Sequence, residues 1–344
     1  MKKLKVGIIG FGSWGECHLE AYRALPFIEV AAVCDAQPAR RARARELGVP
    51  VVCETAEELL READIGLVSV ITFEKAHLQP VLAALEAGKH VLVEKPVATD
   101  AAEAAQMLAA AKRHGRFVAP GHLLRFEPKY AEVRRLIAEG ALGRPASIYM
   151  KRSRNHSLFG TYRRTHTVYE LMIHDLDQAI WYAGSRVKRV TAEGCTLSGG
   201  DVPEILWVQL RFENGMLAVL HSNWMTHDAA GVVINDYTEV VGSEGTVQFD
   251  TDLAGVHLLG IRGRASTDLS VHHRQGGRIV GALKEQLAYI GECALNGTSP
   301  DVVSFEDAIH GIEVADAIVR SARSGEPVEL GGQAALDPNG QGAR

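Results

Sequence analysis

The chain has 344 residues, which is long for one ordinary core and close to the length expected of two domains. Its 37 Lys and Arg residues against 42 Asp and Glu residues leave a net charge of −5, which argues against a general binder of nucleic acid or anionic membranes. A hydrophobic fraction of 47% and a charged fraction of 23% are typical of globular proteins and exclude a disordered or fibrous chain.

The cysteines and the N-terminal segment indicate the compartment. The five cysteines are an odd number without a CxxC pair, whereas a secreted disulfide framework usually has an even, clustered set. The apolar run in MKKLKVGIIGFG is short, broken by glycine and lacks a cleavage pattern, so we do not interpret it as a signal peptide. No stretch approaches the roughly 18 apolar residues of a membrane span. We therefore expect a cytoplasmic, reduced protein with no membrane partner.

The first third of the chain alternates strand and helix patterns. The expected strands cover residues 6–9, 29–34, 51–53, 66–71 and 90–93. Helices are expected at 14–25, in the Arg/Ala-rich segment before residue 48, after Thr55 as N-cap, and at 75–86 and 101–114. Apolar strands separated by such helices indicate parallel βαβ units with both sheet faces covered. We predict an α/β fold whose residues 1–122 form a Rossmann-type, doubly wound parallel sheet.

The pattern changes after about residue 121. A helix near 128–139 is followed by expected strands at 146–151, 188–193, 205–212, 216–224, 238–241 and 246–249. Asn214-Gly215 between two strand-like runs is a strong hairpin signal. Two helices follow at 281–295 and 305–324. We predict a C-terminal α+β domain, residues 123–330, with an open, largely antiparallel sheet, a closing helix packed back on the first domain, and a disordered tail at 331–344.

A glycine-rich loop directly follows the first expected strand and opens the first helix. Its Gly-x-Gly-x-x-Gly spacing allows a tight turn and a close approach of the backbone to a pyrophosphate, whose charge faces the helix N-terminus. Asp35, at the end of the second strand, is the acid expected to bind the adenosine ribose hydroxyls. We therefore predict a dinucleotide site. Its residues in this segment are Gly10, Gly12, Ser13, Trp14, Gly15 and Asp35.

The choice between NAD and NADP depends on charge near that ribose. Asp35 should repel a 2′-phosphate, which favours NAD. Four arginines just downstream could instead reach such a phosphate, or they form a solvated helix face. They are Arg40, Arg41, Arg43 and Arg45. We predict NAD and leave NADP open.

Glu94-Lys95-Pro96 follows the fifth expected strand, at the carboxyl edge where open α/β sheets bind ligands. A lysine there could hydrogen-bond a substrate hydroxyl and stabilise negative charge that develops on its oxygen. Taken alone, a Glu-Lys pair in a loop is more often ordinary surface charge.

Four segments resemble the glucose–fructose oxidoreductase, inositol dehydrogenase and MocA family: VGIIGFGSWG, AGKHVLVEKPVAT, GHLLRFEP and ELMIHDLDQAIWYAG. The resemblance runs from about residue 3 to residue 330. It implies an NAD(P)-dependent oxidoreductase acting on a secondary alcohol of a sugar, cyclitol or nucleotide-linked sugar. It also implies a homodimer or homotetramer formed through the open face of the second sheet. The family further includes glycosidases and lyases that retain NAD, and non-catalytic regulators, and both remain alternatives.

The resemblance assigns roles around the cofactor. Lys95 corresponds to the family's catalytic lysine and also borders the cofactor, Glu94 lies beside the nicotinamide ribose, and the peptide bond after Lys95 is expected to be cis. Thr72 and His77 fall in the cofactor-contacting segment that the family writes as Thr-Pro followed by His. Here Phe73 replaces the proline, which makes backbone contacts from this loop less certain.

Many dehydrogenases of the family have an Asp and a His four residues apart, of which the His is the acid–base. Here the pair is Glu170 and His174, which a helix would place on one face. We expect the Glu170 carboxylate to orient the imidazole and stabilise its protonated form. The predicted catalytic residues are therefore Lys95, His174 and Glu170. Without the resemblance, His174 would more often be structural.

Several arginines lie where the substrate should be, and arginine binds phosphate and carboxylate well. They would imply an anionic substrate such as a nucleotide sugar or a sugar acid, and ordinary surface charge is the alternative. Asp177 either supports the imidazole or forms structural hydrogen bonds. The other histidines have no compact ligand spacing, so we predict no metal. The arginines are Arg125, Arg152, Arg154, Arg163 and Arg164, of which the first four, with Asp177, are predicted to bind substrate.

Overall fold

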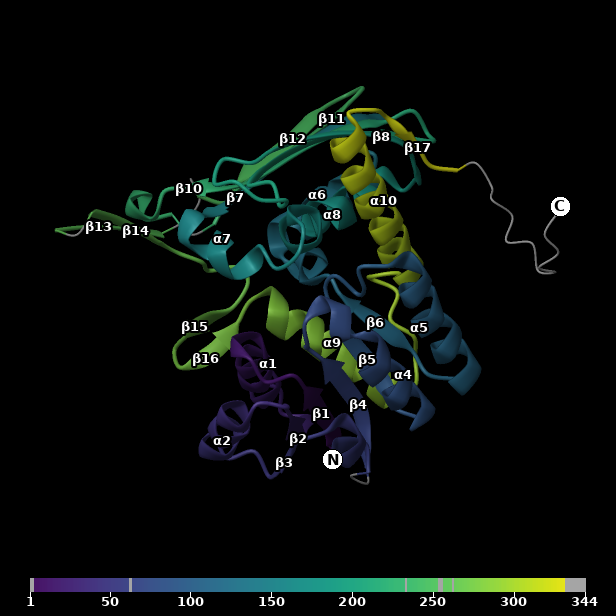
Figure 1. Cartoon of the computed structure of the whole chain (residues 1–344), viewed down its shortest axis with the longest axis vertical. Helices are drawn as coiled ribbons and strands as arrows, with labels where there is room; N and C mark the ends of the chain where they lie inside the picture. The colour runs from purple at the N-terminus through teal and green to yellow at the C-terminus, as the bar shows by residue number, and fades with distance from the viewer. Residues whose placement is uncertain (1–2, 62–63, 233, 253–255, 262, 332–344) are drawn as a thin grey trace.

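A computed structural model describes residues 3–61, 64–232, 234–252, 256–261 and 263–331. Two sheets lie at opposite ends of the molecule, with helices packed between them (Figure 1). Of the tail expected to be disordered, 331–344, all but the first residue lies outside the described residues.

The first sheet is parallel throughout and has the strand order β3-β2-β1-β4-β5-β6. Its strands are almost entirely apolar because helices cover both faces. This confirms the predicted doubly wound Rossmann sheet. The strands are β1 (Leu4–Ile9), β2 (Ile28–Cys34), β3 (Val51–Cys53), β4 (Ile65–Val70), β5 (His90–Glu94) and β6 (Val118–Gly121).

The helices of this domain start and stop at residues whose side chains explain the boundaries. The Thr55 hydroxyl accepts a hydrogen bond from the Glu58 backbone N–H in a capping box, as its place before the helix predicts. Asp100 is the N-cap of the helix Ala101–His114, and Gly115 ends this helix in the left-handed conformation. The helices are α1 (Ser13–Arg23), α2 (Pro38–Glu46), α3 (Ala56–Leu60), η1 (Glu74–Ala76), α4 (Leu78–Glu86) and α5 (Ala101–His114).

The second sheet has the order β12-β11-β7-β10-β9-β8-β17. All its pairs are antiparallel except β7 with β10, so it is a mixed, largely antiparallel sheet. The predicted Asn214-Gly215 turn joins β9 to β10 as an antiparallel hairpin. The strands are β7 (Pro145–Asn155), β8 (Val187–Cys195), β9 (Ile205–Phe212), β10 (Leu217–Thr226), β11 (Asn235–Gly242), β12 (Thr246–Asp250) and β17 (Val328–Glu329).

Only one face of this second sheet is covered. Along β9, Leu206 and Val208 are buried while the intervening Trp207 is 45% exposed, which is the alternation of a half-solvated sheet. Three helices lie between the buried face and the first domain (Figure 1). They are α6 (Pro128–Ala138), α8 (Ile173–Ala183) and α10 (Phe305–Ser324), and a π-helical turn, η3 (Val168–Met172), leads into α8.

Two helices near the C-terminus, α9 (Ala282–Asn296) and α10, contact the first domain. In α9, Leu283 and Leu287 join the core formed by Val6 and Ile8 of β1, so this helix covers the first sheet. The closing helix α10, expected to pack back on the first domain, has β8 and α8 of the second half as its main partners and also contacts α5 and β6.

Several short elements were not expected from the sequence. They are α7 (His156–Tyr162), η2 (Leu123–Phe126), η4 (Asp228–Ala230), and the hairpins β13 (Val256–Gly260) with β14 (Gly263–Thr267) and β15 (His273–Gln275) with β16 (Arg278–Val280). Among the described residues, no helix combines the length and apolarity needed to cross a membrane.

Candidate active site

The glycine loop has the shape that a dinucleotide needs. Gly10 has φ +95°, and a Cβ there would lie 2.5 Å from the Ile71 carbonyl oxygen. A Cβ on Gly15 would lie 2.5 Å from the Gly10 carbonyl oxygen. Gly12, the N-cap of α1, has no atom within 4 Å of its Cβ position. Two glycines are therefore required by close packing, while the third leaves open space at a helix N-terminus, which fits a pyrophosphate.

Asp35 is held at the end of β2, beside this loop. Its Oδ2 accepts a hydrogen bond from the Phe11 N–H at 2.7 Å, and its Oδ1 accepts one from the Gln37 N–H at 2.8 Å. The carboxylate is thus fixed where the adenosine ribose is expected, next to the N-terminus of α1.

Two of the downstream arginines have protein partners. Arg41 donates to the Asp35 carbonyl oxygen at 2.9 Å and to the Glu54 carboxylate at 3.0 Å. Arg43 lies 3.2 Å from the Glu16 carboxylate. These contacts agree better with a solvated helix face than with a phosphate-binding cluster.

Glu94 is a buried carboxylate at the end of β5. Its Oε1 accepts a hydrogen bond from Trp14 Nε1 at 2.9 Å and lies 3.1 Å from His18 Nε2, while Oε2 accepts from the Lys95 N–H at 3.0 Å. Burial raises the pKa of Glu94, but the His18 and Trp14 hydrogen bonds outweigh it and lower the pKa overall. Our sequence analysis missed His18, although its spacing from Trp14 on one helix face could have revealed it.

His77 is almost completely buried and binds backbone. Its Nε2 lies 3.0 Å from the Thr72 carbonyl oxygen, and its Nδ1 lies 3.0 Å from that of Pro96 and 3.2 Å from that of Val97. Both ring nitrogens face backbone carbonyl oxygens, and the contact of this side chain with a cofactor stays a prediction. The ring links the Thr72 segment to the chain after Lys95–Pro96, whose peptide bond is cis, as the resemblance implied.

The Lys95 side chain contacts a residue of the second domain. Its Nζ donates to the Glu170 carbonyl oxygen and to Glu170 Oε1, both at 3.2 Å. The other carboxylate oxygen of Glu170 accepts from Arg164 at 3.1 Å, and Arg164 also binds the buried carboxylate of Glu74 at 3.0 Å. The Glu170 carboxylate thus binds two cations and forms no hydrogen bond to His174 among the described residues, so its effect on the imidazole stays a prediction.

His174 lies in the first turn of α8, half-buried, and its ring has no hydrogen-bond partner among the residues that the structure describes. Burial lowers its pKa well below the usual range, and the positive charges of Lys95 and Arg152 lower the pKa further. The imidazole is therefore neutral at neutral pH and free to accept a proton.

Arg125 and Asp177, both predicted to bind substrate, bind each other. Arg125 Nη2 lies 2.7 Å from Asp177 Oδ1, and Nε lies 3.1 Å from both carboxylate oxygens. The guanidinium also donates to the Val302 carbonyl oxygen at 3.0 Å and to Asp307 at 3.2 Å. Both charges are buried and compensated, so the pair is structural and the prediction is corrected.

The remaining arginines divide into buried and exposed. Arg152 is fully buried between Asp175, at 2.8 Å, and Asp236, at 2.7 Å. Arg154 binds the same Asp236 carboxylate. Their aspartate partners already compensate these two charges, which makes substrate binding by Arg152 and Arg154 less favoured than the sequence suggested. Arg163 is exposed at the end of α7 and remains a candidate.

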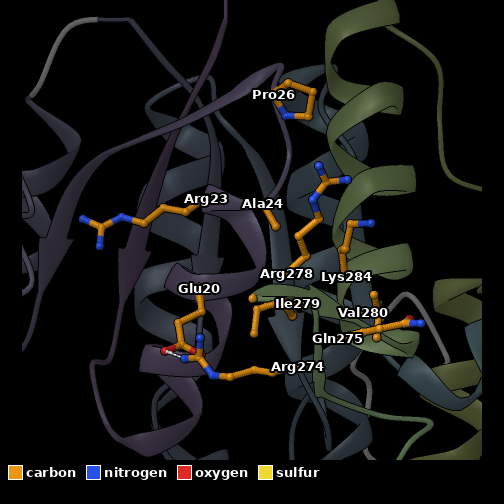
Figure 2. Close-up of a pocket in the computed structure, with 12 residues that line it drawn as sticks. Glu20, Arg23, Ala24, Pro26, Arg274, Gln275, Arg278, Ile279, Val280 and Lys284 are labelled. Atoms are coloured by element: carbon orange, nitrogen blue, oxygen red, sulfur yellow. Dashed lines mark hydrogen bonds and ion pairs between the residues drawn. The ribbon is translucent and has the colours of Figure 1, made fainter.

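A surface groove of about 1140 Å³ lies away from these residues, between α1, the β15–β16 hairpin and α9 (Figure 2). Glu20, Arg274 and Arg278 are among its lining residues, and none of the predicted site residues is. Within the described part of the chain, no group of three or more His, Cys, Asp or Glu residues is arranged to hold a metal ion.

Comparison with known families agrees with this geometry. A model described as "Oxidoreductase family, NAD-binding Rossmann fold" matches residues 4–122, and one described as "GFO/IDH/MocA C-terminal domain" matches residues 130–248. The chain belongs to the Gfo/Idh/MocA oxidoreductase family. Its first domain is therefore an NAD-binding Rossmann domain.

Relatives of this Gfo/Idh/MocA protein match it along nearly its whole length. The scyllo-inositol 2-dehydrogenase (NAD(+)) of Bacillus subtilis is 27% identical over 343 residues, covering 95% of this chain and 96% of the relative. The D-apiose dehydrogenase of Paraburkholderia graminis is 27% identical over 360 residues, covering 96% and 90%. The fold matches scyllo-inositol dehydrogenase from Lactobacillus casei, solved with NAD(H) and scyllo-inositol, with a TM-score of 0.80, 21% identity, and coverage of 95% and 99%.

Proposed function

We propose that this protein is an NAD-dependent dehydrogenase that oxidises a secondary alcohol of a neutral polyol, either a cyclitol or a sugar. One observation carries the proposal. A neutral imidazole without a protein partner, His174, lies near the ammonium group of Lys95, at the carboxyl edge of an NAD-binding sheet. The activities named for the inositol and apiose dehydrogenases support the same reaction class.

Each residue has a defined task in this reaction. His174 accepts the hydroxyl proton at a ring nitrogen, for which its lowered pKa keeps it in the neutral form. Lys95 Nζ donates a hydrogen bond to the same oxygen and stabilises its developing negative charge. Glu170 accepts two hydrogen bonds from the lysine and so holds its ammonium group in place. When bound at the glycine loop, NAD supplies the hydride acceptor, and Asp35 binds its ribose.

The charge balance favours a substrate without phosphate or carboxylate groups. Arg125 and Arg152 are buried and neutralised by aspartates, and Arg154 shares one of them. A nucleotide-linked sugar would need free cations, for which Arg163 is the remaining candidate. We therefore place cyclitols and simple sugars ahead of nucleotide sugars.

The test is NADH formation by the purified protein with NAD and a panel of scyllo-inositol, myo-inositol, D-apiose, sugar acids and UDP-sugars, with Lys95→Ala alongside. We expect turnover on a neutral polyol that is lost in Lys95→Ala, while NAD affinity is retained. NAD binding without NADH formation on any compound would contradict the dehydrogenase and favour a retained-cofactor lyase or a regulator.

We also propose that two or four copies associate through the open face of the second sheet. The exposed Trp207 of β9 and Leu217 of β10 lie on this sheet, and solvent-exposed apolar residues of this size favour self-association. Light scattering after gel filtration measures the mass, and a monomer at micromolar concentration would contradict the proposal.

A further inference from the structure

His122 is the first residue after β6, and the pairing of β6 with β5 places it beside the catalytic lysine. Gly121 pairs with Glu94, so the next residues, His122 and Lys95, leave two neighbouring strands at the same edge of the sheet. Gly121 permits a very close approach, since a Cβ there would lie 2.9 Å from the Glu94 Cα. Neighbouring strands are about 4.8 Å apart, which is within the dimensions of one sugar ring.

The ring of His122 is buried but has no hydrogen-bond partner. The residue is 3% exposed, its Nδ1 is fully enclosed without a partner, and Nε2 forms no hydrogen bond to any residue in the described ranges. The buried His77 and His310 differ, because both nitrogens of each ring have protein partners. Buried polar groups are normally hydrogen-bonded, so this ring is available to a partner from outside the chain.

The charges around His122 keep it neutral. Burial lowers its pKa, the carboxylate of Asp177 opposes this shift, and the guanidinium of Arg125 adds to it. Asp177 and Arg125 bind each other, so neither occupies the His122 ring. The positive charge of Lys95 lowers the pKa of both His122 and His174, as expected of two rings that lie near its ammonium group. Because Nδ1 is enclosed, Nε2 is the nitrogen that can donate a hydrogen bond to a hydroxyl group or accept one from it.

We propose that His122 is a substrate-binding residue that hydrogen-bonds the hydroxyl on the carbon next to the one oxidised, and so selects vicinal diols over isolated alcohols. This inference rests on the proposed function, because Lys95 and His174 then share the reacting oxygen. With the reacting oxygen already bound by Lys95 and His174, the ring of His122 is left for a different hydroxyl. The hydroxyl on the neighbouring carbon of a polyol then forms a hydrogen bond with the His122 ring.

The test compares trans-1,2-cyclohexanediol with cyclohexanol in the wild type, His122→Phe and His122→Gln. We expect the wild type to prefer the diol in kcat/KM at least about tenfold, the value of one hydrogen bond to a buried group. In His122→Phe the preference should fall close to one, and in His122→Gln it should be partly restored. The melting temperature and NADH affinity of both variants should match the wild type. An unchanged preference in His122→Phe overturns the inference and leaves the dehydrogenase assignment intact.

A second measurement does not depend on turnover. In protein carrying 13C-labelled histidine, the Cε1–H signal of His122 is identified as the one that is missing from the spectrum of His122→Gln. Titration of the wild-type NADH complex with scyllo-inositol should shift this signal. Calorimetry should give a Kd at least about tenfold weaker in His122→Phe. If scyllo-inositol binds without turnover, the dehydrogenase assignment fails and the shift still decides the role of His122. If no neutral polyol of the panel binds or reacts, both proposals are overturned.

Discussion

Lys95 Nζ lies 3.2 Å from both the carbonyl oxygen and a carboxylate oxygen of Glu170, so a residue of the second domain holds the lysine of the first. Replacing Glu170 with Ala should lower kcat about tenfold, because the loss of one charge-assisted hydrogen bond leaves the ammonium less well positioned. NAD affinity should not change. Steady-state kinetics with NAD titration measures both.

Glu170→Gln is the matched control, since it keeps the backbone carbonyl contact and the side-chain length but removes the charge. Its kcat should fall between the wild type and Glu170→Ala. Wild-type kcat in Glu170→Ala would show that Lys95 needs no support from the second domain.

The low pKa of His174 predicts the pH dependence of oxidation. The base must be neutral to accept a proton, and burial with the charges of Lys95 and Arg152 lowers its pKa, so the neutral form persists as the pH falls. We expect kcat/KM for alcohol oxidation to stay level from about pH 8 down to about 6.5, the ordinary histidine pKa, and to decline below it. His174→Ala should remove most of the activity and this acid limb. A limb centred at or above the ordinary pKa of histidine would contradict the role of His174.

Gly12 and Gly15 should respond differently to the same substitution. Gly15→Ala places a Cβ 2.5 Å from the Gly10 carbonyl oxygen, so it should lower the melting temperature and abolish NAD binding. Gly12→Ala meets no protein atom within 4 Å and should leave the melting temperature unchanged, while the added methyl weakens NAD binding about tenfold or more. Equal NAD affinity in Gly12→Ala and the wild type would place the pyrophosphate elsewhere.

Asp35→Asn tests the choice of cofactor. The amide keeps the shape of the carboxylate beside Phe11 but loses the charge that repels a 2′-phosphate. We expect the Kd for NAD to rise about tenfold and the Kd for NADP to change less or to fall. Fluorescence titration with the two reduced cofactors gives both constants, and an unchanged ratio between them would refute the ribose contact.

The Arg125–Asp177 pair should contribute to stability and not to substrate affinity. Asp177→Ala leaves a buried guanidinium with one aspartate fewer, which costs about 3–5 kcal/mol of unfolding free energy. Urea denaturation measures this cost. The exposed pair of Arg320 with Asp316 is the control, and Arg320→Ala should leave the urea midpoint almost unchanged. A stable Asp177→Ala variant with a raised KM would restore the role predicted from the sequence.

Much of the fold follows from local patterns. Apolar strands between helices predict the parallel sheet, and the glycine spacing after β1 predicts the turn that the structure contains, because backbone conformation and burial of one face depend on residues a few positions apart. The Asn214-Gly215 hairpin follows for the same reason. The short hairpins β13–β14 and β15–β16 were not foreseen, since their strands have little apolar alternation.

The roles of the charged side chains were decided by the tertiary structure. Arg125 binds Asp177, which is 52 residues away in the sequence. Arg152 binds Asp236 at a separation of 84 residues, and Lys95 binds Glu170 at a separation of 75 residues. Residue type in the sequence shows that a charge is present, but not whether a distant partner neutralises it. The sequence by itself therefore determined the parallel sheet and the dinucleotide loop, while Lys95 and His174 were predicted from the family resemblance. Only the tertiary structure decided which arginines form buried ion pairs and which histidine rings remain free for a substrate. The reason is that both depend on burial and on partners that folding brings within hydrogen-bond distance.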